Sequence, residues 1–307
     1  MRSPSRYVFG AGVAGLALVV AACGSSSKSG SSTGSSTPPK TMKIGAFNFP
    51  ESAILAGIYE GALKKTGFDV TVRPNLGSRE VVAPALERGE IDLYPGYAAT
   101  DLEFYNNSAG QATPDPQATT EKLRAVLASK GSTALDPSPA IDANAFAVTK
   151  ATADKYNLKK LSDLAPVAGQ LELGGPPECP TRPFCQAGLV STYGLNFKEF
   201  KPLDVGGPLT VAALKGGDID VGLLTSTDGA IPANGFVVLE DDKHLQNADN
   251  VVPVIRTAAA DDKARQTLNK VSAALTTADL TDLNKRAGVD KEDPEVLAQD
   301  WLQKHGF

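Results

Sequence analysis

The sequence has few of the residues that enzymes use most often for catalysis or metal binding. Its 307 residues include only two histidines and three cysteines. Residues 42–307 contain no Gly-x-Ser-x-Gly, no Gly-x-x-x-x-Gly-Lys-Ser/Thr and no His-Glu-x-x-His motif. His244 and His305 are far apart in the sequence and stand in polar surroundings, so we interpret both as solvated side chains. We therefore expect neither a metal nor a cofactor, and a protein that is not an enzyme.

Basic and aromatic residues are also scarce. Lysine and arginine number 30 against 35 aspartates and glutamates, which gives a net charge of −5 and a pI of about 5.2. This balance argues against a nucleic-acid-binding protein. Aromatic residues make up only 6% of the chain, so each phenylalanine or tyrosine in a loop becomes a candidate for function.

A single apolar run lies near the N-terminus. It extends from Tyr7 to Val20 behind Arg2 and Arg6, and it is too short and too rich in glycine and alanine for a transmembrane helix. This is the shape of a secretory signal. The following Ala21-Ala22-Cys23 resembles the lipobox of bacterial lipoproteins, in which the cysteine is lipidated. We predict a signal peptide over residues 1–22 and lipidation of Cys23; a plain signal peptide with an incidental cysteine is the alternative.

The segment after Cys23 has almost nothing to bury. Residues 24–39 are nearly all serine, glycine and threonine and end in Pro38-Pro39. Such a composition is typical of a flexible linker, with a mean reach of roughly 20–25 Å. We predict a tether over residues 23–41 that holds an extracytoplasmic body at the outer face of the cell membrane.

Strand and helix signals alternate through the rest of the chain, which predicts an α/β protein built from parallel units. The expected strands are 42–47, 69–73, 91–94 and 144–149, and the expected helices are 50–67, 81–88, 121–130 and 152–164. The segment 85–93, ending in Ile91-Asp92-Leu93, matches the segment 213–221, ending in Ile219-Asp220-Val221. This repeat predicts two lobes of similar architecture. Because ligands bind beyond the carboxyl ends of strands in such sheets, we expect a cleft between loops 94–97 and 225–229.

Several segments together resemble a known family. They are Asn48-Phe49, Gly77-Ser78, Gly89 to Tyr97, Gly175 to Glu178, Ser226-Thr-Asp-Gly229 and Val238 to Lys243. In this order they resemble the ProX/OpuAC-like substrate-binding proteins of ABC importers for glycine betaine, choline and related osmoprotectants.

The resemblance implies a type II periplasmic-binding-protein fold, in which two α/β lobes enclose a ligand cleft. Lobe I would comprise residues 42–142 and 251–307, and lobe II residues 143–250. The partners would be a small-molecule solute, ABC permease subunits with a cytoplasmic ATPase, and the membrane through the lipid anchor, and we expect a monomer. The implied ligand-binding residues are Asn48, Phe49, Ser78, Tyr97, Asn144, Gln186, Thr225, Ser226 and Thr227.

The chain departs from this family where the family keeps aromatic rings. Betaine sites of the family hold the quaternary ammonium by cation–π attraction to a cage of tyrosines. Tyr97 matches one cage position, but Gln186 and Thr225 stand where rings are usual. From sequence alone we therefore expect weak binding of glycine betaine, and a hydroxylated or aromatic solute stacked on Tyr97 and Phe49 as the alternative.

Other residues have a structural interpretation beside the functional one. Tyr94 could belong to the core, and Asp228 could cap the following helix. We expect Phe184 to pack on the cysteine loop, Arg182 to pair with Glu178, and Arg79 to be solvated.

Three competing functions remain open from the sequence. An enzyme would require Asp92 and Asp220 to converge as a carboxylate pair, but the repeat favours a structural role within each lobe. A surface adhesin or structural lipoprotein would not need two equivalent strand-end loops, whereas a sensor module that feeds a membrane kinase is compatible with the sequence.

We predict a disulfide between Cys179 and Cys185, because an exported chain with two cysteines six residues apart and no histidine nearby favours a disulfide over a metal site. By loop entropy it adds roughly 2 kcal/mol to stability. Thiol labelling of the native, unreduced protein with Cys23 replaced should find no free thiol. Quantitative labelling of both cysteines would contradict the prediction.

Overall fold

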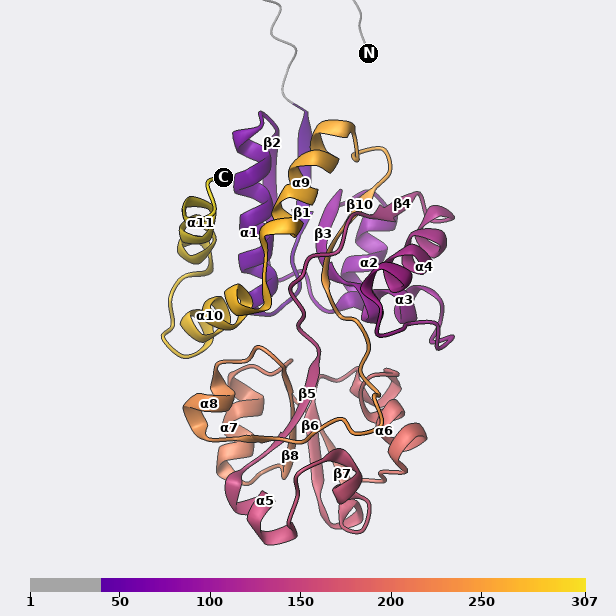
Figure 1. The fold of residues 1–307 in the computed structure, drawn as a ribbon, viewed down its shortest axis with the longest axis vertical. Helices are drawn as coiled ribbons and strands as arrows, with labels where there is room; N and C mark the ends of the chain where they lie inside the picture. Colours follow the sequence, from indigo (N-terminus) through magenta and orange to yellow (C-terminus); the bar gives the residue numbers. More distant parts are fainter. Residues whose placement is uncertain (1–39) are drawn as a thin grey trace, which may run out of the picture. The chain divides into compact units, whose positions relative to one another are not determined.

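The computed structural model describes residues 40–307. The predicted signal peptide, Cys23 and the tether up to residue 39 lie outside the described residues. The described chain forms two lobes, and each is built on one five-stranded sheet flanked by helices (Figure 1).

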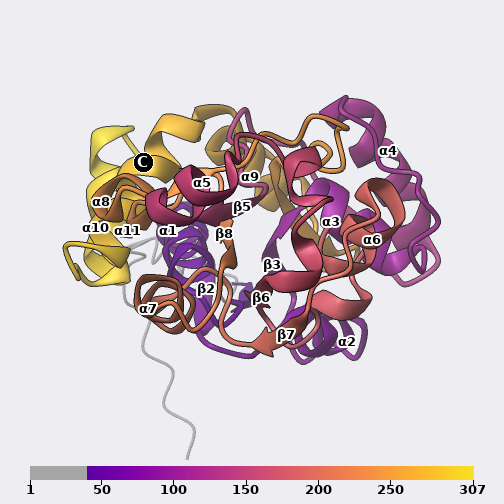
Figure 2. The same cartoon turned by 90° about the horizontal axis from the view of Figure 1, so that it is seen from below.

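The first sheet has the strand order β2-β1-β3-β10-β4. Its strands are β1 Thr41–Gly45, β2 Asp69–Arg73, β3 Leu93–Tyr97, β4 Ser132–Ala134 and β10 Val251–Arg256. Its helices are α1 Pro50–Lys65, α2 Arg79–Glu87, α3 Ala98–Tyr105, α4 Pro116–Ala128, α9 Asp262–Ala274, α10 Thr277–Gly288 and α11 Pro294–Lys304. Helices α1, α9, α10 and α11 lie on one side of this lobe and α2, α3 and α4 on the other (Figures 1 and 2).

The second sheet has the strand order β7-β6-β8-β5-β9. Its strands are β5 Asn144–Val148, β6 Glu172–Gly175, β7 Glu199–Pro202, β8 Val221–Thr225 and β9 Val237–Val238. Its helices are α5 Lys150–Tyr156, α6 Gln186–Tyr193, α7 Pro208–Gly216 and α8 Ala230–Asn234, with short 3₁₀ turns at Leu161–Leu164, Ala168–Gln170 and Cys179–Thr181. Cys179 and Cys185 are joined by a disulfide, with their Cα atoms 5.1 Å apart.

Both sheets are mixed: the predicted parallel units are present, with β1 parallel to β2 and β3, and β6 parallel to β7 and β8, but each sheet also contains antiparallel strands. Strand β10 runs antiparallel to β3, and β5 runs antiparallel to β8. Each of these strands enters its sheet from the junction between the lobes, at the edge where the parallel strands end. Asn144 is thus paired with Thr225, and Val251 with Tyr97. A strand that starts at that edge can only run back along its neighbour.

Two local predictions also need correction. Helix α5 ends at Tyr156, because Asn157 takes a left-handed conformation with φ of 53°, and only a 3₁₀ turn follows before Leu164. The third strand starts at Leu93 and continues through Tyr97, so residues 94–97 form a strand and not a loop.

The sequence explains why α1 lies against the first sheet. Pro50 starts the helix at a position where its missing N–H costs nothing, and Glu51 occupies the first turn. Ile54, Leu55 and Ile58 then recur at helical spacing and are fully buried. This packing fixes the N-terminal end of α1, together with Phe49 and Glu51, at the junction between the lobes.

The repeated segment has the same structural role in both lobes. The Asp92 carboxylate accepts a hydrogen bond from the Lys43 N–H at 2.9 Å, and Asp220 accepts one from the Glu172 N–H at 2.9 Å. In each case the aspartate immediately precedes one strand and binds the backbone of the neighbouring strand. The two carboxylates belong to different lobes, each hydrogen-bonded within its own sheet.

The isoleucine of the repeat explains a glycine in each neighbouring strand. A Cβ atom on Gly45 would lie 2.6 Å from the Ile91 Cδ1 atom, and one on Gly174 would lie 2.5 Å from the Ile219 Cδ1 atom. In both lobes, therefore, the isoleucine of the repeat packs closely against a glycine of the neighbouring strand.

No helix among residues 40–307 combines the length and the apolar character that a membrane crossing requires.

We expect Asp92→Ala and Asp220→Ala each to lower the free energy of unfolding by about 1 kcal/mol or more, because each leaves a backbone N–H of the neighbouring strand without its protein acceptor. Asp92→Ala should cost more, since Asp92 also pairs with Arg256 at 3.0 Å. Urea unfolding measures both. The Asn variants keep an acceptor oxygen and serve as controls. An Asn variant as unstable as its Ala counterpart would refute the hydrogen-bond explanation.

Candidate functional site

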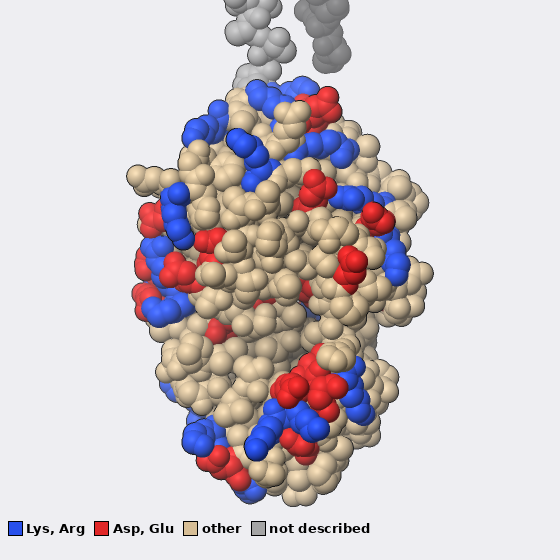
Figure 3. Space-filling view, in the orientation of Figure 1, with Lys and Arg blue, Asp and Glu red and all other residues tan. Residues whose placement is uncertain are grey.

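A cavity of about 580 Å³ is lined by residues of both lobes. Its walls come from the loop before α1, the start of α2, the end of β3 with α3, the start of β5, the end of β8, and the disulfide loop. The carboxyl ends of parallel strands from both sheets thus meet at one place, as expected for an α/β ligand site. Space-filling shows a furrow between the lobes with acidic atoms exposed at several points (Figure 3).

Six of the nine residues that the sequence suggested for ligand binding line this cavity. They are Asn48, Phe49, Ser78, Tyr97, Asn144 and Thr225. The other three, Gln186, Ser226 and Thr227, are not among the lining residues.

Gln186 does not line the cavity. Of the two polar residues that were expected to replace rings of the aromatic cage, Gln186 and Thr225, only Thr225 therefore borders the cavity. The position of Gln186 at the start of α6 follows the disulfide, and its backbone N–H donates to the Cys179 Sγ atom at 3.3 Å. Phe184, two residues earlier, lines the cavity instead. Its carbonyl accepts hydrogen bonds from the Asn144 and Gln246 amides at 2.9 and 3.0 Å, which hold this part of the loop in place.

Five aromatic rings therefore border the cavity. They belong to Phe47, Phe49, Tyr97, Phe104 and Phe184. Phe47 and Phe49 are stacked with centroids 5.6 Å apart, and Phe49 and Tyr97 lie 6.2 Å apart. Sequence reasoning missed Phe104 because it lies within α3 and not in a loop, and it assigned Phe184 only to packing against the cysteine loop.

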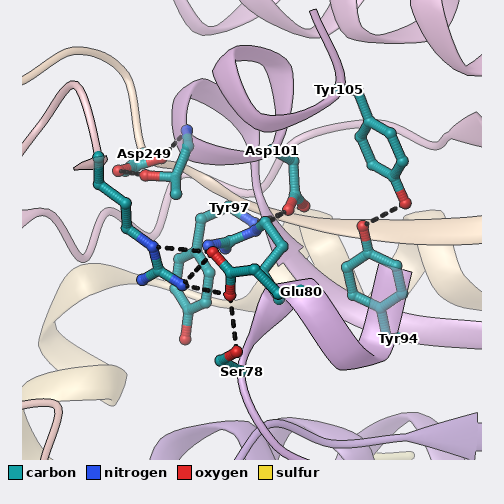
Figure 4. Close-up of polar contacts among 10 residues, drawn as sticks. Ser78, Glu80, Tyr94, Tyr97, Asp101, Tyr105 and Asp249 are labelled. Carbon is teal, nitrogen blue, oxygen red and sulfur yellow. Dashed lines mark hydrogen bonds and ion pairs between the residues drawn. The ribbon is translucent and has the colours of Figure 1, made fainter. Parts of the chain in front are cut away.

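An ion pair joins the two lobes beside the cavity. The Arg182 guanidinium binds the Glu80 carboxylate at 2.9 Å, and the Ser78 hydroxyl donates to the same carboxylate at 2.6 Å (Figure 4). Partial burial acts to raise the pKa of Glu80, but Ser78 and Arg182 outweigh it and lower the pKa below its ordinary value. The expected Arg182–Glu178 pair was wrong, since the partner of Arg182 comes from the other lobe.

Arg79 is buried, which corrects the expectation of a solvated side chain. It pairs with the fully buried Asp101 (Figure 4). Its guanidinium carbon lies 5.1 Å from the Phe47 ring centroid. Nearby, Asp249 accepts hydrogen bonds from the Thr100 N–H and hydroxyl at 2.8 and 2.6 Å. Burial raises the pKa of Asp249 to about 6.

Tyr94 is also a core residue: it is fully buried, and its hydroxyl lies 3.2 Å from that of Tyr105 (Figure 4).

A buried polar network lies at the junction of the lobes. The Thr227 hydroxyl contacts the Asp142 carboxylate at 2.6 Å and the Asn284 amide at 2.8 Å. Glu51 accepts hydrogen bonds from the Tyr97 hydroxyl and the Asn284 amide. Burial, helped by the nearby Asp142, raises the pKa of Glu51 from 4.5 to about 8. Tyr97 and Asp142, which both line the cavity, thus connect this network to the cavity wall.

The residues around Thr227 are positioned by the same network. The Ser226 hydroxyl accepts a hydrogen bond from the Ala143 N–H at 3.1 Å. The Asp228 carboxylate accepts one from the Ala230 N–H at 2.7 Å, at the start of α8. Asp228 thus binds the first backbone N–H of α8, although Gly229 occupies the cap position itself.

The family model "Substrate binding domain of ABC-type glycine betaine transport system" matches residues 40–304. The chain belongs to this family. Like its other members, it is a substrate-binding protein of an ABC importer with a periplasmic-binding-protein fold.

Curated relatives of this substrate-binding protein cover most of its length. It is 30% identical over 278 residues to the "Carnitine transport binding protein OpuCC" of Listeria monocytogenes, which covers 87% of each chain. It is 28% identical over 279 residues to the "Glycine-betaine-binding protein" of Pseudomonas aeruginosa, covering 87% of this chain and 88% of the relative.

A solved structure titled "Crystal structure of glycine betaine/carnitine/choline ABC transporter" shares the fold. It superposes with a TM-score of 0.67 at 29% identity and covers 86% of this substrate-binding protein and 98% of the solved chain. Within residues 40–307 no group of three or more His, Cys, Asp or Glu side chains is arranged to hold a metal ion.

We expect stability to fall as pH rises from about 5 to about 8. In this window Glu51 keeps its proton in the folded protein but loses it in the unfolded chain, so unfolding releases a proton. One such group contributes a slope of at most about 1.4 kcal/mol per pH unit. Urea unfolding at several pH values measures it.

Glu51→Gln should flatten this slope, whereas Glu121→Gln, at an exposed position of α4, should leave it unchanged. A slope equally steep in Glu51→Gln and in the unaltered protein would refute the assignment to Glu51.

Proposed function

We propose that this protein captures a small quaternary-ammonium solute of the glycine betaine, carnitine and choline class and delivers it to the permease of an ABC importer. The observation that carries the proposal is a single cavity that combines aromatic rings with carboxylates. A quaternary ammonium group has no hydrogen-bond donor, so aromatic faces and nearby negative charge are the means by which a protein can hold it.

The rings favour this solute class over a purely hydroxylated or aromatic solute. The sequence suggested a depleted cage because of Thr225 and Gln186, but only Thr225 lines the cavity. Phe104 and Phe184 add two rings to those of Phe49 and Tyr97. In the proposed complex these four rings surround the ammonium group, and Thr225, Asn144, Asn48 and Ser78 contact the rest of the solute.

The remaining assignments follow from the proposed role. We infer that Cys23 carries the lipid, that residues 23–41 tether the body to the outer face of the membrane, and that a permease with a cytoplasmic ATPase receives the solute. In this proposal residues 42–142 with 251–307 form one closing lobe and residues 143–250 the other, and the monomeric protein binds solute without catalysing a reaction.

Isothermal titration calorimetry of the full chain in detergent tests the solute class. Choline, glycine betaine or carnitine should bind. Phe49→Leu and Phe184→Leu should each weaken that binding by roughly 2- to 30-fold, corresponding to 0.5–2 kcal/mol per ring. Leucine is the matched replacement because it keeps an apolar side chain without the ring quadrupole.

The neutral alcohol in which carbon replaces the nitrogen of choline is the control solute. It should bind more weakly than choline and respond little to Phe49→Leu. If none of the three quaternary ammonium compounds binds, or if the neutral alcohol binds as tightly as choline, the proposal is wrong.

A further inference from the structure

The charged groups that line the cavity are unequal in number. Six carboxylates face two guanidinium groups. The carboxylates belong to Glu80, Glu103, Asp142, Glu178, Asp204 and Asp249. A positive charge in the cavity is therefore attracted by the wall as a whole, and a negative charge is repelled.

Both guanidinium groups are already paired with carboxylates. Arg182 binds Glu80 at 2.9 Å, and Arg79 binds Asp101, which is buried behind the wall. Arg79 also attracts Asp249. A solute carboxylate could gain a guanidinium partner only by displacing a protein carboxylate, so the arginines offer little to an anionic group.

The other side-chain donors of the wall are also largely engaged. The Ser78 hydroxyl donates to Glu80 at 2.6 Å, the Thr100 hydroxyl to Asp249 at 2.6 Å, and the Asn144 amide to the Phe184 carbonyl at 2.9 Å. Tyr97 donates to Glu51 and Thr181 to the Glu178 carbonyl, and the Thr225 side chain acts on Asp142 by opposing the rise that burial causes in its pKa.

Three lining residues have side-chain donors that are not engaged within residues 40–307. The side chains of Asn48, Asn107 and Ser108 donate to no acceptor among the described residues, and all three residues are exposed. A solute carboxylate would therefore find few available donors on the buried part of the wall. An uncharged hydroxyl group can instead donate to the carboxylates that are present.

We propose that the cavity selects a solute of net positive charge, an ammonium alcohol of the choline kind, over zwitterions that carry a carboxylate. This rests on the proposed function, because the same aromatic rings would hold the ammonium group of either solute. The selectivity comes from the end of the solute opposite the ammonium group. A carboxylate there is repelled by the negative wall and finds the donors occupied, whereas an uncharged hydroxyl is not repelled and can donate to the wall carboxylates.

The test compares choline with glycine betaine by calorimetry on the full chain in detergent. We expect choline to bind at least about tenfold more tightly than glycine betaine. The wall carboxylates attract the net positive charge of choline, whereas they repel the carboxylate of glycine betaine across several ångströms. If neither compound nor carnitine binds, the proposed function fails. If glycine betaine binds as tightly as choline or more tightly, the charge selection is wrong and the proposed function stands.

Glu178→Gln tests the cause. Glu178 lines the cavity, and its carboxylate has no hydrogen-bond or ion-pair partner among the described residues, so the change removes a charge with little structural disturbance. The change should weaken the binding of choline several-fold, and it should leave the binding of glycine betaine unchanged or make it tighter. Glu199→Gln, on exposed β7 outside the cavity, removes the same charge and should alter neither. Equal weakening of both solutes by Glu178→Gln, or an equal effect of Glu199→Gln, would overturn the electrostatic explanation.

Discussion

The hydroxyl of Thr227 is the point at which the parts of the binding site are joined. It contacts Asp142 in the segment between the lobes, Asn284 of α10 and, at 3.4 Å, Glu51 of α1. Glu51 in turn accepts from Tyr97, whose ring lines the cavity. Buried carboxylates without such partners would destabilise the protein strongly, so the groups must stay together. The placement of Tyr97 therefore depends on contacts made by both lobes.

The alternation of strands and helices was predictable because the apolar spacing within each short stretch of sequence indicates whether it forms a strand or a helix. The apolar spacing of α1 indicates a helix, and the matched segments around Asp92 and Asp220 indicate two similar lobes. The antiparallel directions of β5 and β10 were not predictable in the same way. They depend on where the chain crosses between the lobes, which no short window of sequence specifies.

The binding site was only partly predictable for a related reason. Asn48, Phe49 and Ser78 follow strands of the first lobe and Tyr97 ends one, and the family resemblance located all four. Phe104 lies inside a helix, and the choice between Phe184 and Gln186 depends on how the disulfide loop turns. The Arg182–Glu80 pair joins residues 102 positions apart, which is a tertiary contact with no local signal.

The two chain segments that connect the lobes run side by side: Ile141 pairs with Asn250 in an antiparallel bridge, and the Asp142 N–H donates to the Asp249 carbonyl at 3.2 Å. In architectural terms the second lobe is an inserted domain whose two ends are adjacent. Its sheet is formed entirely by strands between residues 144 and 238, and none of them is shared with the first lobe. Such an insertion can be exchanged as one continuous cassette, so solute preference could be altered by replacing one wall of the cavity while the other wall keeps its own core.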